Sequence, residues 1–501
     1  MTVPIIGEAA QGLTPRDLRR VVVGGAVLAA LVGLVAGVSG GIGGAAIAVG
    51  LVGIVAVTLL YIHRPFWVVI GFWIFLLLQD SIAAALGKGG GAGALVSKAE
   101  NPMIAVLLLL SLVFGQRRPR GRWLLFGPGA VFFAAGFLGG VFNHIHPNIL
   151  ILGAWLGVKA WVLFVIALYL PWNEATVLRM YRVIVGVAIP VALLTFVDLF
   201  APGPFRAALG LPSASDVRLG IQAARSIFPN PALLSSFMFL SLCLLVARMT
   251  FVRKRYDILW AGTLSVAAVL SLRFKAVLGI ATAFAIVATF RPRALGKAVG
   301  PRVVFLLVAA VIVGGIGYGV ASRQVTTYAS TETPRTRLTA TAVTIAKSDF
   351  PLGVGFGHYG SAPSSFPYPY SPVYNKYGFW MINGLDKLNP AFLHDTSWAT
   401  VIGETGALGW LAYAGGLVLL IGVLALQARN DKQSRAAQMA SLAGLATMVA
   451  FLFDSAGRPA IFDAFTCLSV GLVIAPALAL GRMPRSRPEL PDAVERILAS
   501  A

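Results

Sequence analysis

One histidine and one glutamate stand where a polar segment passes into a long apolar run, in AFLHDTSWATVIGETGALGW at residues 391–410. His394 is a candidate general base, because an unperturbed imidazole titrates near pH 6.5. The alternative is a histidine that caps a helix or lies at a membrane interface. We expect Asp395 to cap the helix that follows. Glu404 lies about 15 Å further along that helix, which favours a structural ion pair or hydrogen bond over contact with substrate.

Several basic residues lie near the ends of predicted helices, away from the loops that carry most of the Lys and Arg. They are Arg225, Arg273, Lys275, Arg335, Arg337 and Arg458. A cation at a membrane boundary is costly unless it pairs with an acid or binds a ligand. Because a guanidinium donates two parallel hydrogen bonds to phosphate, the set predicts one anion site. The alternative for any single arginine is contact with lipid headgroups.

Another cation, Lys159, falls in the middle of the apolar run LILGAWLGVKAWVLFVIALYL. An ammonium group within a span is functional or ion-paired by default. Glu404 and Asp198 are the two candidate partners.

Closely spaced glycines mark the segment PLGVGFGHYG, at Gly353, Gly355, Gly357 and Gly360. No strand, helix or lysine follows in the manner of a nucleotide-binding loop. We instead expect a tight irregular turn whose backbone lies close to a neighbour or a ligand. His358, within this turn, is the reserve candidate base.

The acidic residues and the cysteines form no metal-binding pattern. Cys243 and Cys467 both lie in apolar runs, where we interpret them as small buried or lipid-facing residues. The acids expected on the same side as the cations are scattered: Asp216, Glu332, Asp349, Asp386, Asp395, Asp454 and Asp463. We therefore expect no metal and no other cofactor.

Composition places these residues in an all-α, multi-pass membrane protein. Of the 501 residues, 58% are hydrophobic and 12% are charged, which is roughly half the charge of a soluble domain. Lys and Arg in short loops explain the net charge of +21 without nucleic acid. Apolar runs predict about fourteen transmembrane helices. They lie near 20–39, 42–62, 66–87, 102–115, 123–142, 148–171, 182–201, 230–249, 256–272, 275–291, 303–321, 396–427, 437–453 and 460–481.

A cytoplasmic N-terminus puts nearly every basic cluster on the cytoplasmic side. Residues 1–19 are then a tail rather than a cleaved signal peptide. The other segments are helices 1–11 in 20–321 with an external loop at 202–229, a large external loop at 322–395 that carries active-site elements, helices 12–14 in 396–481, and a cytoplasmic tail at 482–501. The aromatic and apolar residues of the large loop argue against disorder.

Three motifs, in this order and on the same predicted side, resemble the bacterial O-antigen ligase and polymerase superfamily. They are RSIFPNPALLSSF, RTRLTATAVTIAKSDFPLGVGFGHYG and LHDTSWATVIGETGALGWL, within about residues 215–425. LSLRFKAVLG resembles the family's Ser-Arg-Gly-Ala turn loosely, so either Arg273 or Lys275 occupies the arginine position. Asp395 stands where the family has asparagine.

The resemblance implies a GT-C-like glycosyltransferase in the bacterial plasma membrane. Members transfer a glycan from an undecaprenyl-diphosphate carrier on the outer side of that membrane to a glycan or glycolipid acceptor. It implies that His394 lies near the acceptor hydroxyl and that arginines bind the diphosphate. We expect membrane lipids to surround the protein and transfer to need no metal. We also expect direct displacement with inversion of the anomeric configuration.

Two other classes remain open. A transporter or flippase of a lipid-linked or anionic solute would use broken helices and charged mid-span residues such as Lys159. A scaffold for envelope assembly would leave the cations and the histidine without a use.

Overall fold

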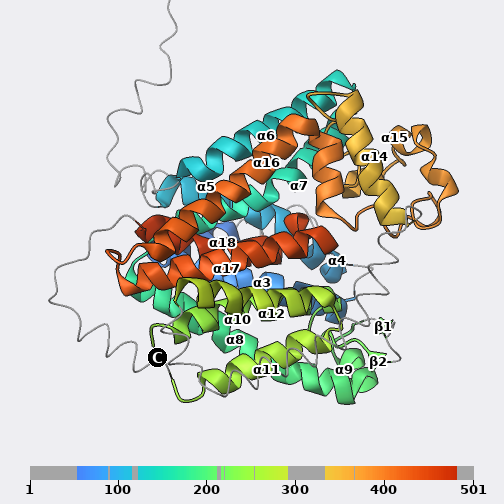
Figure 1. Cartoon of the computed structure of the whole chain (residues 1–501). Coiled ribbons are helices and arrows are strands. Elements are labelled where there is room, and N and C mark those ends of the chain that lie inside the picture. Colours follow the sequence, from blue (N-terminus) through green and yellow to red (C-terminus); the bar gives the residue numbers. More distant parts are fainter. Residues whose placement is uncertain are drawn as a thin grey trace, which may run out of the picture.

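The computed structural model describes residues 53–87, 91–115, 122–211, 216–218, 221–252, 254–291, 333–365 and 367–481. The predicted helices at 20–39 and 303–321, most of that at 42–62, and both predicted tails lie outside these ranges. Helices make up most of the described part, and its one sheet is a two-stranded hairpin (Figure 1).

The first half of the described chain contains α3 (Pro65–Ala85), α4 (Gly91–Lys98), α5 (Glu100–Phe114), α6 (Arg122–Phe142), α7 (Pro147–Leu168), α8 (Glu174–Phe200) and α9 (Pro202–Ala208). The hairpin β1 (Val217–Arg218) and β2 (Ile221–Gln222) follows, antiparallel, with Val217 opposite Gln222.

The second half contains α10 (Pro231–Met249), α11 (Asp257–Leu270), α12 (Phe274–Phe290), α14 (Pro334–Ser348), α15 (Pro372–Lys376), α16 (Ser397–Arg429), α17 (Arg435–Gly457) and α18 (Ala464–Leu480). Three short 3-10 turns are η1 (Ala362–Ser364), η2 (Phe379–Met381) and η3 (Ala460–Phe462).

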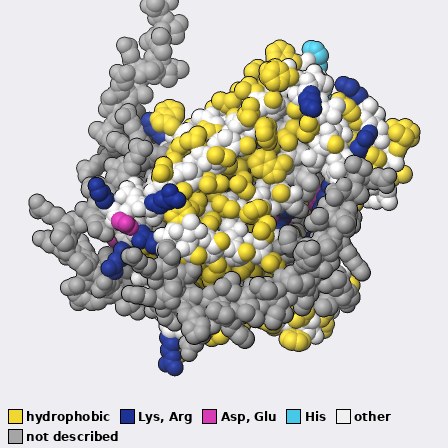
Figure 2. Space-filling view, in the orientation of Figure 1, with side chains coloured by type: hydrophobic (Ala, Val, Ile, Leu, Met, Phe, Trp, Pro, Cys, Tyr) yellow, Lys and Arg dark blue, Asp and Glu magenta, His cyan; other side chains and the backbone are white. Residues whose placement is uncertain are grey.

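Several helices of the described chain can cross a membrane. Seven are long and apolar enough, or eight if the bent pair α4–α5 forms one span. Four shorter apolar helices, Gly53–His63, Asp257–Leu270, Lys275–Phe290 and Ala464–Leu480, accompany them. Figure 2 shows the matching surface, a broad hydrophobic band with Lys and Arg toward its two ends. The chain is thus a multi-pass membrane protein, as its composition predicts.

Polar caps explain where several helices begin. The side chain of Asn230 accepts from the backbone N–H of Leu233 at the start of α10, and Asp463 accepts from that of Thr466 at the start of α18. Asn173 does the same for α8 by accepting from Thr176. α8 therefore begins eight residues before the predicted span at 182–201. Hydropathy does not reveal this start, because the first two turns of the helix are polar.

Residues 333–396, here called the loop module, contain helices and a hydrophobic core of their own. The core lies between α14 and the segments around α15 and η2, and extends onto the start of α16. It comprises Leu338, Ala342, Ile345, Val354, Tyr359, Tyr374, Phe379, Leu385, Leu393 and Ala399. The ordered packing expected from the aromatic residues of this loop is present in its described residues.

Candidate functional site

The glycine turn lies against a break in α16. Gly406 has a φ of 63° inside the helix, which interrupts its hydrogen-bond ladder. The backbone carbonyls of Gly403 and Glu404 instead accept from the N–H groups of Val354 and Gly355, at 3.0 and 2.9 Å. Leu408 N–H, in turn, donates to the carbonyl of Pro351 at 3.0 Å. The loop module therefore completes the backbone hydrogen bonds of a membrane helix.

Two positions of the turn require glycine, because the backbones of neighbouring helices lie very close to them. Gly355, with a φ of 94°, lies against the backbone of Gly140 in α6, and Gly357, with a φ of 86°, lies against the backbone of Ile149 in α7. A side chain at either position would meet both an unfavourable φ and a neighbouring backbone. The turn is thus wedged among α6, α7 and α16.

The carboxylate of Glu404 holds the next part of the turn. Its Oε1 accepts from the backbone N–H groups of Gly357 and Tyr359 at 2.9 and 3.1 Å, and from Ser361 Oγ. The residue is 2% exposed, and no ion pair of the described residues includes it. Glu404 therefore makes the structural hydrogen bonds that we expected, with the turn as its partner.

His394 lies across the turn from Glu404. Its Nδ1 is 3.2 Å from the backbone carbonyl of Gly360, and its Nε2 is 2.8 Å from Ser365 Oγ. Burial lowers the pKa of the His394 imidazole, and the hydrogen bond to Gly360 offsets part of that effect. Burial also lowers the pKa of His358, the reserve base. The imidazole of His394 is thus neutral and oriented at neutral pH.

Asp395 does not cap α16, which corrects our expectation. The N-cap position belongs to Thr396, and no side chain caps the helix there. Instead, Asp395 Oδ2 accepts from Nε and Nη2 of Arg335, in the first turn of α14. Arg337, two residues further, is exposed, and no acid in the described chain forms an ion pair with it. The two arginines of this motif thus differ in what they offer an anion.

A second charged cluster surrounds Asp454 of α17. Lys275 of α12 and Arg458, just after α17, both form ion pairs with it, Arg458 at 2.8 Å. Ser236 of α10 donates to Asp454 Oδ2 at 2.7 Å, and Asp463 lies 4.0 Å from Arg458. Two of the candidate cations therefore share one buried carboxylate.

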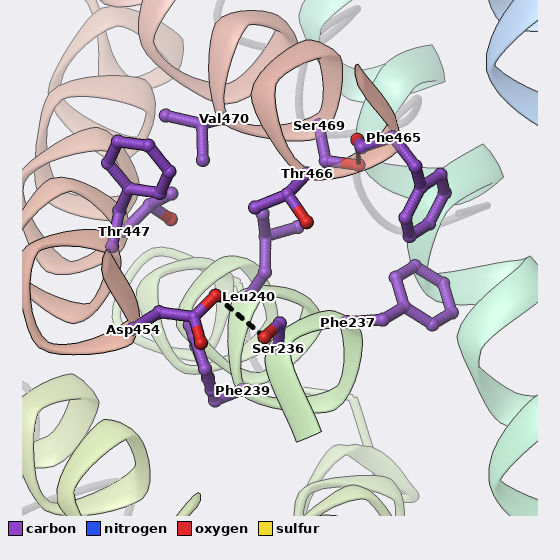
Figure 3. A pocket seen from close by; sticks show the side chains of 11 residues that line it. Ser236, Phe237, Phe239, Leu240, Thr447, Asp454, Phe465, Thr466, Ser469 and Val470 are labelled. Atoms are coloured by element: carbon purple, nitrogen blue, oxygen red, sulfur yellow. Dashed lines mark hydrogen bonds between the residues drawn. The ribbon is translucent and has the colours of Figure 1, made fainter. Parts of the chain in front are cut away.

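A small pocket opens beside this cluster, between α10, α17 and α18. Figure 3 shows Asp454 and Ser236 joined on one side of it, and the rings of Phe237 and Phe465 on another. Those ring centroids are 5.6 Å apart. Mostly apolar walls and a cavity of about 10 Å³ leave room for roughly one water molecule. The pocket by itself cannot accept a sugar or a diphosphate.

Other candidate cations also have acidic neighbours. Arg273 forms an ion pair with Asp216, beside the β1–β2 hairpin. Arg225 is 5% exposed, and its backbone N–H donates to Asp198 at 2.7 Å. Asp198 also forms an ion pair with Arg206 at 2.7 Å. Four of the acids that looked scattered along the chain, Asp216, Asp395, Asp454 and Asp463, thus each form an ion pair with a predicted anion-site cation.

Lys159 has a partner that we did not predict. Its Nζ lies 2.7 Å from Glu100, the first residue of α5, rather than beside Glu404 or Asp198. Asp198 is occupied by Arg206, and Glu404 is occupied by the glycine turn. Glu100 was overlooked because its neighbours gave no sign that a span bends there.

Hydrogen bonds join these groups at one end of the helical bundle. Ser397, at the start of α16, donates to the backbone carbonyl of Arg458 at 2.9 Å. Ala224 N–H donates to the carbonyl of Leu270 at the end of α11, at 3.0 Å. Figure 1 shows α9, the hairpin, α14 and α15 at this same end. The histidine and most of the candidate cations therefore share one end, while Lys159 lies within the bundle.

Sequence reasoning missed two serines at the histidine. Ser361 contacts Glu404, and Ser365 contacts His394. Both serines are at most 5% exposed. Serines in a polar loop carry no pattern that distinguishes these two from the rest.

Comparison of the chain with family models, with curated proteins and with solved structures finds no match. In the described part of the chain, no three His, Cys, Asp or Glu side chains are grouped so that they could hold a metal ion.

Proposed function

We propose that this protein is a membrane glycosyltransferase of the O-antigen ligase or polymerase type. It transfers a glycan from an undecaprenyl-diphosphate carrier to an acceptor hydroxyl at the external face of the bacterial plasma membrane. The finer architecture is part of the proposal: about fourteen spans, a GT-C-like arrangement, and both termini in the cytoplasm. Membrane lipids surround it, and it needs no metal.

The observation that carries the proposal is the environment of His394. A neutral imidazole with one nitrogen on a backbone carbonyl has its other nitrogen available as a proton acceptor. Here Nδ1 faces the carbonyl of Gly360, and Nε2 faces a hydroxyl, that of Ser365, at 2.8 Å. A hydroxyl is the group that a glycosyl acceptor brings to its base.

The reaction divides between the histidine and the cations. The acceptor O–H loses its proton to His394 Nε2 while its oxygen attacks the anomeric carbon. The bond from that carbon to the diphosphate oxygen breaks, and its electron pair leaves with the diphosphate. Fixed cations stabilise that leaving charge. Attack opposite the leaving group inverts the anomeric configuration.

The ion pairs indicate which cation is most available to stabilise the leaving diphosphate. Arg337 is exposed, whereas Arg335 shares its charge with Asp395. Lys275 and Arg458 share Asp454, so this cluster is cationic only in part. We therefore assign the direct diphosphate contact first to Arg337, with Arg225, Arg273, Lys275, Arg335 and Arg458 as the surrounding field.

A test supplies a radiolabelled undecaprenyl-diphosphate oligosaccharide and a membrane extract as acceptor to the purified protein in lipid. We expect transfer that is lost in His394→Ala and Arg337→Ala, retained in His144→Asn, an exposed histidine outside the site, and indifferent to chelator. Label in a new acceptor indicates a ligase, and label in longer chains indicates a polymerase. Full transfer by His394→Ala would exclude the base assignment.

A transporter or flippase is the second candidate, and one observation favours it. The helices α4 and α5 are bent by 42° at a short break, and Glu100 at that break pairs with the buried Lys159. Broken helices with intramembrane charges are typical of transporters. A wild-type protein that moves the labelled donor across vesicles without cleaving it would place this function first.

A further inference from the structure

The carbonyl of Gly360, which faces His394, is held on both sides by one carboxylate. Glu404 Oε1 accepts from the preceding residue, Tyr359, at its backbone N–H and from the following residue, Ser361, at its hydroxyl. The N–H of Gly360 itself donates to the hydroxyl of Tyr374 at 2.7 Å. The peptide groups around Gly360 therefore have little freedom to rotate.

These contacts of Glu404 with Tyr359 and Ser361 hold Gly360 in an unusual conformation. Its φ is 73°, and a side chain there would collide with Thr400 of α16. Glycine can leave such a conformation easily, because it populates both signs of φ. Without the carboxylate, the carbonyl has several accessible directions, of which one points at the histidine.

A fixed carbonyl determines which nitrogen of His394 carries the proton. A carbonyl oxygen accepts and cannot donate, so the neutral imidazole places its proton on Nδ1. The lone pair then lies on Nε2, where the hydroxyl of Ser365 donates at 2.8 Å. In the opposite tautomer, Nδ1 and the carbonyl would both present lone pairs at 3.2 Å.

We propose that Glu404 is a positioning residue that fixes the tautomer of His394 through the 357–361 turn, so that Nε2 is the nitrogen available to a substrate hydroxyl. The catalytic part of this inference rests on the proposed function, whereas the tautomer is a property of the free protein. Because all three contacts to Oε1 come from neutral donors, an amide oxygen can replace the carboxylate.

The test reads the tautomer directly, from nitrogen chemical shifts of the full-length protein labelled with 15N-histidine, at a pH above 7.5. The signals of His394 are assigned with His394→Gln. We expect a protonated Nδ1 and an unprotonated Nε2 in the wild type and in Glu404→Gln. In Glu404→Ala we expect a mixture of tautomers. Asp386→Asn is the matched control, since Asp386 also accepts backbone N–H groups in the loop module but does not contact the turn.

Transfer kinetics add a second measurement. We expect kcat of Glu404→Ala to fall by about 100-fold, with the KM for the lipid donor changed less than about twofold, because a misdirected base loses most of its contribution. Glu404→Gln should recover most of that loss. A variant that harms only the fold would lower the folded fraction without changing the tautomer of what remains.

The outcomes separate the two proposals. An unchanged wild-type tautomer in Glu404→Ala would overturn the positioning role. If that variant does not fold, Ser361→Ala decides, since it removes one of the three donors: a new protonated Nε2 signal supports the role and an unchanged spectrum overturns it. A mixed tautomer in Glu404→Ala together with full transfer by His394→Ala would keep the positioning role and reject the proposed function.

Discussion

Glu404 and Asp454 are both almost fully buried near the same end of the bundle, yet their neighbours differ in charge. Glu404 accepts from two backbone N–H groups and a hydroxyl. Asp454 accepts from a lysine, an arginine and a hydroxyl. Neutral donors satisfy the carboxylate of Glu404 without a buried cation, and burial lowers the pKa of the nearby His394 imidazole. The Asp454 cluster instead holds two cations on one buried carboxylate.

Removal of the carboxylate of Asp454 should have the largest effect on stability. Asp454→Ala leaves two cations without their buried partner, which costs about 3–5 kcal/mol of unfolding free energy. The measurement is denaturant unfolding in mixed micelles, with Asp386→Asn as the control at a partly exposed carboxylate. A loss below about 1 kcal/mol would mean that water already compensates these charges.

Loss of the imidazole should have the largest effect on activity. His394→Ala should reduce the rate of transfer by about 100-fold to 10,000-fold, the usual contribution of a general base. Its thermal midpoint should stay close to that of the wild type, because His394 makes only two hydrogen bonds. A fall in the midpoint that matches the fall in activity would indicate a structural role instead.

Glu404→Ala tests the carboxylate whose hydrogen-bond partners are all neutral. It leaves two backbone N–H groups and one hydroxyl without an acceptor, which costs about 1–3 kcal/mol. The loss should be smaller than for Asp454→Ala in the same unfolding measurement, since no buried cation is exposed. A larger loss would contradict the distinction between the two carboxylates.

The pH dependence of transfer follows from the pKa of His394. Burial holds that pKa below its ordinary value of 6.5, and a base works only when unprotonated. Activity should therefore be constant above pH 7 and fall as the pH drops through a midpoint below 6.5. A midpoint above 7 in the profile of kcat/KM would show that a nearby acid stabilises the imidazolium.

The smallest effect should follow from the partly exposed ion pair of Arg335 and Asp395. Their side chains are 22% and 24% exposed, and pairs of this kind contribute about 0–1 kcal/mol. Asp395→Asn should thus leave stability nearly unchanged, while increasing affinity for the lipid diphosphate by releasing the charge of Arg335. Weaker donor binding in that variant would contradict this interpretation.

The apolar helices could be predicted from the sequence because hydropathy is a local property of about 20 residues. The start of α8 could not be placed that way, since its first turns are polar and depend on the cap at Asn173. The glycine spacing predicted a close backbone approach, and Gly355 lies against Gly140 accordingly. It gave no indication that the partner helix would be broken.

Charge pairing was the hardest part to predict. Lys275 and Asp454, or Lys159 and Glu100, are far apart in the chain, and only the packing of helices brings them together. A sequence reveals that a buried cation needs a partner, but it does not identify that partner. The prediction for Asp395 was wrong for the same reason. Its position in the sequence favoured a helix cap, whereas the packing of α14 brings Arg335 against its carboxylate.

The break at Gly406 has a consequence for engineering this protein. Because the loop module supplies hydrogen bonds that α16 lacks, its borders do not coincide with the ends of helices. A chimera that exchanged residues 333–396 alone would leave carbonyls of a membrane helix without partners. The module could be exchanged without that loss only together with α16 and the glycine-bearing faces of α6 and α7, so change in this loop requires coordinated change in three helices.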